Sequence, residues 1–208
     1  MKKIKKLAHT IALLIIAPMA SAEISLTGTL TSDYVFRGVS QTDSSPAFQA
    51  SVDYGHHNGF FAGVWSSNVD FEDDASAEIN AYLGYFGEVD STLSYDISYT
   101  HYAYIGYGSN ENYDYGEIIL NTYLKAFTVT VGHASDYLNL GDAALYIGAA
   151  YDMELPNEYG LTIQAGYNSG DAYKDVEYAD YSMTVAKTFY GFDLAAAIIN
   201  TDIDDDSD

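Results

Sequence analysis

The sequence has no cysteine, only three prolines and few basic residues. Without cysteine, no disulfide can stabilise the fold, so the chain must be held together by other interactions. Its 8 lysines and arginines stand against 30 aspartates and glutamates, and half of these bases lie before residue 7. Because so few bases cannot neutralise a phosphate backbone, nucleic acid is not an expected partner. The bases that remain after residue 22 are Arg37, Lys125, Lys174 and Lys187.

A long hydrophobic run is also missing after residue 22. Before that point, four lysines precede an apolar segment, Leu7 to Met19, which ends at the small residues Ala20-Ser21-Ala22. The order of basic, apolar and small residues predicts a secretory signal peptide over residues 1–22. The alternative, a membrane anchor helix, needs about 20 apolar residues and is disfavoured by length. We therefore expect export, with cleavage after Ala22 and a mature chain of residues 23–208.

Tyrosine and glycine are abundant, with 21 Tyr and 17 Gly, and apolar residues recur at every second position. In the first such segment, Ile24, Leu26, Leu30, Tyr34 and Phe36 share one parity, whereas serine, threonine, Asp33 and Arg37 share the other. A period of two indicates a strand with one apolar and one polar face. The alternation predicts eleven strands, at 24–37, 48–54, 61–70, 78–85, 93–100, 117–125, 127–131, 145–153, 161–168, 181–188 and 192–198.

The connections between these segments alternate between short and long. The short ones are 55–59, 87–91, the junction at Lys125–Ala126, 156–160 and 190–191; the long ones are 38–46, 72–76, 107–116, 135–142 and 169–180. Short turns at one end and longer loops at the other are typical of bacterial outer-membrane barrels. The polar parity is also too hydrophilic for a dry core, so the apolar parity is expected to face lipid. A secreted β-sandwich is the alternative fold.

The fold class expected is therefore all-β: a transmembrane, up-and-down antiparallel β-barrel. Single-chain bacterial barrels have an even number of strands, whereas eleven are predicted here. The expectation is about twelve strands, with the closing C-terminal strand missing from this sequence, so that residues 23–208 are a fragment of the barrel domain.

Two stretches resemble a known family. "TSDYVFRGVSQT" (31–42) and "GVWSSNVDF" (63–71) are similar to the Gcw_chp family of exported proteobacterial proteins, also called TorF-type porins. The resemblance implies a Gram-negative outer-membrane protein and brings no catalytic residues with it. Members end in a terminal strand that closes on an aromatic residue, and this sequence departs from them by ending at Asp208.

Motifs of catalysis and metal binding are missing from the sequence: it has no G-x-S-x-G elbow, H-E-x-x-H helix or P-loop. His56 and His57 lie in a short turn without the spacing of a defined metal site. His133 and Asp136 are the best acid–base candidates, although polar residues are common at a barrel rim. We expect no enzyme activity, no cofactor and no metal.

The polar parity supplies the candidate functional residues. Arg37 is predicted to be an ion-pair partner across the lumen, a constriction charge or part of a salt bridge at the rim. Acids outnumber bases on this face, so the lumen should attract cations. The expected function is passive diffusion of small polar solutes or ions; the alternative is a non-conducting barrel that acts as a lipase- or protease-like enzyme or binds through its acidic, tyrosine-rich loops. The lumen-facing candidates are Asp33, Arg37, Asp53, Glu78, Asp96, Glu117, Lys125, Asp152 and Asp193.

Overall fold

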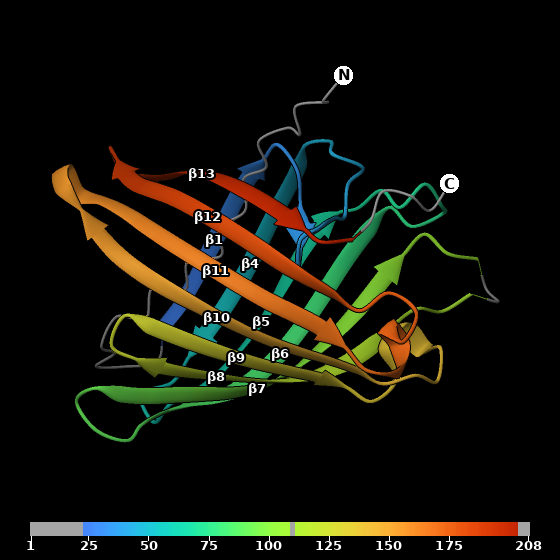
Figure 1. The fold of residues 1–208 in the computed structure, drawn as a ribbon, viewed down its shortest axis with the longest axis horizontal. Helices are drawn as coiled ribbons and strands as arrows, with labels where there is room; N and C mark the ends of the chain where they lie inside the picture. Colours follow the sequence, from blue (N-terminus) through green and yellow to red (C-terminus); the bar gives the residue numbers. More distant parts are fainter. Residues whose placement is uncertain (1–22, 109–110, 204–208) are drawn as a thin grey trace.

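Antiparallel strands make up most of the chain that the computed structural model describes, residues 23–108 and 111–203 (Figure 1). The predicted signal peptide, residues 1–22, lies outside this part of the chain. Within it, eleven strands form one sheet in which each strand pairs with its neighbour in sequence. These strands are β1 (Glu23–Thr31), β4 (Ala47–Gly55), β5 (Phe60–Asn68), β6 (Ala77–Glu88), β7 (Leu93–Ile105), β8 (Tyr115–Leu124), β9 (Phe127–Ala134), β10 (Ala144–Leu155), β11 (Tyr159–Ser169), β12 (Tyr178–Phe189) and β13 (Phe192–Thr201).

The remaining elements are small and lie in the connections. A two-stranded ribbon, β2 (Val35–Phe36) and β3 (Val39–Ser40), stands apart from the main sheet. Single turns of 3₁₀ helix are η1 (Tyr137–Asn139), η2 (Pro156–Glu158) and η3 (Asp171–Tyr173). No helix within the described residues has the length and hydrophobicity to cross a lipid bilayer.

The order of the strands confirms the predicted up-and-down, all-β class. Every pair of neighbours is antiparallel, and short and long connections alternate along the chain as predicted. We call the two ends of the sheet the short-turn end and the long-loop end; the latter lies at the right in Figure 1. Figure 1 also shows the sheet curling, so that it has an inner and an outer face. In the described residues, β1 and β13 are not paired with each other, and the sheet is not closed.

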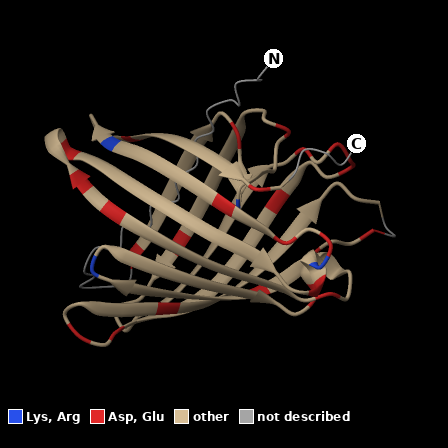
Figure 2. Cartoon of the chain, in the orientation of Figure 1, with Lys and Arg blue, Asp and Glu red and all other residues tan. Residues whose placement is uncertain are grey.

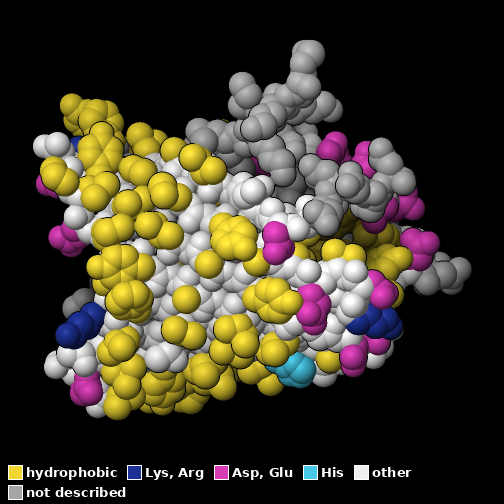
Figure 3. All heavy atoms as spheres, in the orientation of Figure 1, with side chains coloured by type: hydrophobic (Ala, Val, Ile, Leu, Met, Phe, Trp, Pro, Cys, Tyr) yellow, Lys and Arg dark blue, Asp and Glu magenta, His cyan; other side chains and the backbone are white. Residues whose placement is uncertain are grey.

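The two faces differ in chemistry as the alternation predicts. On the outer face, Leu26 is 78% exposed and Leu30 is 80% exposed, and apolar side chains cover the outside of β10 to β13 (Figure 3). On the inner face, by contrast, Glu78 and Glu117 are almost completely buried. The strands therefore turn their apolar parity to the surroundings and their polar parity inward.

Two strand predictions were wrong. The first strand ends at Thr31 rather than continuing to residue 37, because the Thr31 hydroxyl donates to the Asp33 carbonyl (2.8 Å) and the chain turns inward there. Tyr34 is consequently buried and does not share the outer face with Leu30.

The second error is the facing of β5. Phe61 and Trp65 were expected on the outer face, but Phe60 and Val64 are the exposed residues, at 57% and 47%. Trp65 instead meets the inward-turned Tyr34, with ring centroids 5.2 Å apart. Val69, expected in the same strand, follows its end and is buried. The inner face of this strand is therefore aromatic.

Candidate functional site

The connection between β1 and β4 folds back against the inner face of the sheet. We call residues 32–46 the inner loop. Its ribbon, β2 and β3, turns at Arg37 and Gly38, whose φ angles are 46° and 84°. Two successive positive φ values form the tight hairpin turn that glycine accommodates best. A Cβ on Gly38 would lie 2.4 Å from Thr201 Cγ2, so the turn packs directly against the far end of β13.

Polar contacts at the base hold the inner loop in shape. The Ser40 hydroxyl donates to the Asp33 carboxylate at 2.6 Å, and the Thr42 hydroxyl oxygen accepts from the Tyr34 N–H at 3.1 Å. The Asp70 N–H donates to the Gln41 carbonyl at 2.8 Å, which ties the loop to the next long connection. The loop is thus a structured element rather than a loose strap.

At the tip of the loop, Arg37 forms an ion pair with Glu117 of β8. Arg37 Nη2 lies 2.6 Å from Glu117 Oε1, and the two side chains are 8% and 1% exposed. The Tyr102 hydroxyl donates to the other carboxylate oxygen at 3.1 Å. Burial by itself lowers the pKa of Arg37, but the charge and hydrogen bond of Glu117 together with the neighbouring Tyr102 and Tyr115 more than offset this, and the pKa lies above its usual value. Arg37 is therefore cationic at any physiological pH.

Aromatic rings enclose the Arg37 guanidinium. Its central carbon lies 4.2 Å from the centroid of the Tyr146 ring and 4.7 Å from that of Phe36. Such cation–π contacts are strongest where water is excluded, as it is at this buried site. The guanidinium is fixed by Glu117 and by these rings together.

The other side of the loop rests on β5 and β6. The Tyr34 hydroxyl donates to the Glu78 carboxylate, at 3.2 and 3.4 Å from its two oxygens. Burial raises the pKa of Tyr34, and the negative charge of Glu78 raises it further, so the phenol stays protonated. Asn80 Nδ2 donates to Glu78 Oε1 at 2.7 Å. The inner loop thus contacts both halves of the curled sheet.

Tyrosines fill the long-loop end around the inner loop. Tyr102 and Tyr115 stack with centroids 4.5 Å apart, and a chain of ring contacts continues through Tyr137 and Tyr173 to Tyr178. At the short-turn end, by contrast, inner-face residues such as Asp152 and Asp193 are exposed. The inner space is therefore narrow at the long-loop end and open at the other.

The structure places most of the predicted site residues on the inner face or in the inner loop. Asp33 and Arg37 belong to the loop, and Glu78, Asp96 and Glu117 are buried on the sheet. The predicted acids on the sheet accept hydrogen bonds mainly from neighbouring inner positions. Tyr123 and Asn121 donate to Asp96, and the hydroxyls of Tyr82 and Ser51 donate to Asp53. The hydroxyl of Thr162 donates to Asp152, and that of Thr188 donates to Asp193.

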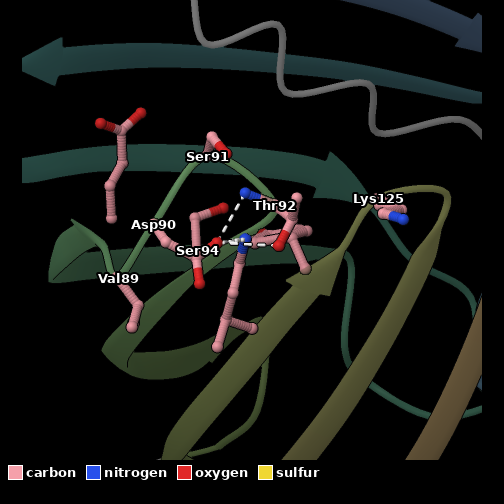
Figure 4. A pocket seen from close by; sticks show the side chains of 9 residues that line it. Val89, Asp90, Ser91, Thr92, Ser94 and Lys125 are labelled. Atoms are coloured by element: carbon pink, nitrogen blue, oxygen red, sulfur yellow. Dashed lines mark hydrogen bonds between the residues drawn. The ribbon is translucent and has the colours of Figure 1, made fainter.

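The prediction that Lys125 faces the lumen was wrong. Lys125 lies in the turn between β8 and β9 with a φ of 55°, and it is exposed rather than directed to the inner face. Together with the β6–β7 turn it borders a hollow at the short-turn end (Figure 4). Asp90 in this hollow accepts from Thr92 N–H and hydroxyl groups at 2.7 and 2.8 Å, and the Thr92 N–H bond lowers the pKa of Asp90. Because that carboxylate is already satisfied by its own turn, the hollow is not the candidate site.

The acid–base candidates are not brought together. His133 pairs across the sheet with Ile118 and Leu145, so it faces outward. Asp136 Oδ1 accepts from the Gly141 N–H at 2.7 Å. His56 contacts Asn58, with its Nδ1 2.6 Å from Asn58 Oδ1. These contacts are those of ordinary turns and strand faces.

The family model for Gcw_chp, a bacterial protein of unknown function, matches residues 17–207. The chain belongs to the Gcw_chp family. No curated protein and no solved structure matches it. One of the two stretches that carry the family resemblance, "TSDYVFRGVSQT", begins with the last residue of β1 and forms most of the inner loop, including its Arg37 turn. In this member of the family, one of the two family-like stretches is thus part of the element that fills the long-loop end of the inner space.

Sequence reasoning missed the inner tyrosines and Asp180. Tyr102, Tyr146 and Tyr178 are buried on the inner parity of their strands, although tyrosine is equally suited to a lipid interface. Asp180 was assigned to a loop, yet it belongs to β12 and is 3% exposed. The inward parity of Asp180 relative to Tyr181 and Met183 was the available signal.

Proposed function

We propose that this protein is an outer-membrane β-barrel channel through which small polar solutes or cations diffuse passively. The observation that carries the proposal is the outer face. Many large apolar side chains on it are 36–80% exposed on strand after strand, for example Leu30, Leu83 and Ile163. An apolar band of this extent is unfavourable in water but suits the lipid-facing side of a barrel.

The proposal requires that the two sheet edges be joined. An unpaired strand edge is not viable in hydrocarbon, because its N–H and C=O groups have no partners there. β1 and β13 must therefore be linked in the membrane. One further strand between them gives twelve, the even number usual for bacterial barrels.

The charges on the inner face favour cations. Arg37 is neutralised by Glu117, and Lys125 lies outside the inner face. The acids that remain there include Asp53, Asp96, Asp152, Asp180 and Asp193. Figure 2 shows further acidic residues in the connections and few bases in the described part of the chain. A wall of one sign of charge attracts counter-ions and repels ions of like charge.

The inner loop is proposed to form the constriction of the pathway. It contacts β6 through Tyr34, β8 through Arg37 and β13 through Gly38, so it crosses the inner space from one wall to the other. The same packing favours a second candidate, a non-conducting barrel that binds partners through its acidic loops, because the long-loop end is filled with side chains.

Electrical recording separates these two functions. The full chain, refolded in detergent, is inserted into a planar bilayer with a potassium chloride gradient across it. A channel should show discrete conductance steps and a reversal potential with the sign of cation selectivity. This preference should weaken as salt rises, because the screening length falls from about 10 Å at 0.1 M to about 3 Å at 1 M. Inserted protein without steps would favour the non-conducting barrel, and an anion-selective reversal potential would contradict the charge assignment.

A further inference from the structure

We propose that Glu78, Asn80 and Tyr34 form a binding site for one monovalent metal cation between the inner loop and the wall of the sheet. The inference rests on the proposed function and specifies where a permeating cation pauses. It starts from two groups that protein contacts leave incompletely satisfied.

The first group is the Glu78 carboxylate. Glu78 is only 2% exposed, and its hydrogen-bond partners are neutral: the Tyr34 hydroxyl and Asn80 Nδ2. The salt bridge found in the described part of the chain joins Arg37 to Glu117, so Glu78 has no basic partner there. A carboxylate removed from water is costly unless a positive charge accompanies it or it takes up a proton.

The second group is Asn80 Oδ1. Asn80 is 8% exposed, and this oxygen is buried without a hydrogen-bond partner among the residues described. Buried amide oxygens nearly always have a donor or another electropositive partner. Nδ2 of the same amide group donates to Glu78 Oε1. The unpartnered Asn80 Oδ1 therefore lies close to the uncompensated carboxylate. A cation coordinated by both oxygens satisfies both groups.

The donor set selects the class of cation. A carboxylate, an amide oxygen and a phenol oxygen are hard ligands, which favour alkali or alkaline-earth ions over transition metals. Among the residues described, no three His, Cys, Asp or Glu side chains gather to form a metal site. Glu78 alone supplies one negative charge, which balances one sodium or potassium ion, whereas calcium sites combine several carboxylates.

A similar arrangement at Asp180 is less suitable. Asn168 Nδ2 donates to Asp180 at 3.2 Å, and Asn168 Oδ1 has no partner in the described chain. However, Asp180 packs against the Gly38 turn, and the positive charge of Arg37 acts on it. Of these two carboxylates, Glu78 is the one that lacks such compensation.

Because Tyr34 belongs to the inner loop, the bound cation would join the loop to β6. The test uses thallium(I), a heavy substitute for potassium with strong anomalous scattering. Crystals of the full chain soaked in thallium acetate should show an anomalous peak in coordination contact with Glu78 and Asn80. The peak should vanish in E78Q and persist in E88Q, which changes an exposed acid at the other end of the same strand. A thallium-soaked crystal of the unsubstituted protein that lacks this peak would overturn the proposal.

A solution measurement supplies an independent readout. The urea midpoint of unfolding should rise when potassium replaces N-methylglucamine at constant ionic strength. E78Q should lose this rise even if it folds more stably, and E88Q should retain it. An equal rise in E78Q would overturn the site. Neither test requires conduction, so a silent bilayer with a thallium peak would reject the channel and keep the site, and a conducting native protein without the peak would do the reverse.

Discussion

Arg37 carries a buried positive charge, and a single carboxylate, that of Glu117, neutralises it. Replacing Arg37 with alanine leaves Glu117 buried and uncompensated, and loss of one partner of such a pair typically costs about 3–5 kcal/mol. We expect R37A to lower the free energy of unfolding by about this amount. Urea titration followed by the fluorescence of Trp65, the single tryptophan, measures it.

Neutralising the partner provides the control for this prediction. In R37A/E117Q neither position of the former ion pair carries a charge, so the double variant should be more stable than R37A alone. K125A removes an exposed base and should change stability by less than about 0.5 kcal/mol. If R37A behaves like K125A, the Arg37–Glu117 pair does not hold the inner loop.

Gly38 is constrained both by its φ of 84° and by the atoms it touches. Three alanine substitutions separate these effects. Gly28 has an ordinary φ and room for a Cβ, and Gly141 has a φ of 88° and room for a Cβ. At Gly38 an added Cβ would clash with Thr201 and Asp180. A left-handed backbone costs a non-glycine residue about 1–2 kcal/mol. We therefore expect the loss of stability to increase from G28A to G141A to G38A, and equal losses in G141A and G38A would argue against the packed turn.

At the scale of the strand, facing should decide the cost of a charge. Ile163 is on the outer face of β11 and 41% exposed, whereas its neighbour Thr162 faces inward and donates to Asp152. If the outer face meets lipid, I163R should cost about 2–4 kcal/mol near the bilayer midplane. T162R would extend toward Asp152 and should change stability by about 0.5 kcal/mol or less. Unfolding from lipid vesicles measures both, and equal costs would mean that the outer face is not in lipid.

Strands and turns could be predicted from the sequence because a strand that is apolar on one side must alternate with period two. The inner loop could not be predicted in this way. Tyr34 and Phe36 continue the parity of Leu30, so a continuous strand and an inward-folded hairpin show the same alternation in the sequence. Parity also cannot distinguish an aromatic side chain in lipid from one packed in a lumen, which is why β5 was assigned the wrong facing at Phe60 and Phe61.

The candidate site could be predicted in part for the same reason. Acids such as Glu78 and Glu117 stand on the polar parity, so their inward direction follows from the alternation. Their partners come from segments 44 and 80 residues away, at Tyr34 and Arg37. Such pairings depend on how the sheet curls, and local periodicity contains no information about that.

At the scale of the whole molecule, the expected location is the outer membrane. Export should leave Glu23 as the mature N-terminus, and the protein should remain in the membrane fraction after the inner membrane has been dissolved by a mild detergent. N-terminal sequencing and fractionation measure these two results. Recovery as a soluble periplasmic protein would favour the sandwich, in which the apolar faces pack against protein.

We propose above that the inner loop narrows a membrane channel. The most direct measurement compares the single-channel conductance of the full chain with that of a variant in which residues 33–41 are replaced by a short Gly-Ser linker. Removing this segment takes Tyr34, Arg37 and Gly38 out of the long-loop end and keeps every residue of the eleven strands of the main sheet. We expect a larger conductance for the variant, with cation selectivity retained. Equal conductance, or silence in both proteins after verified insertion, would contradict it.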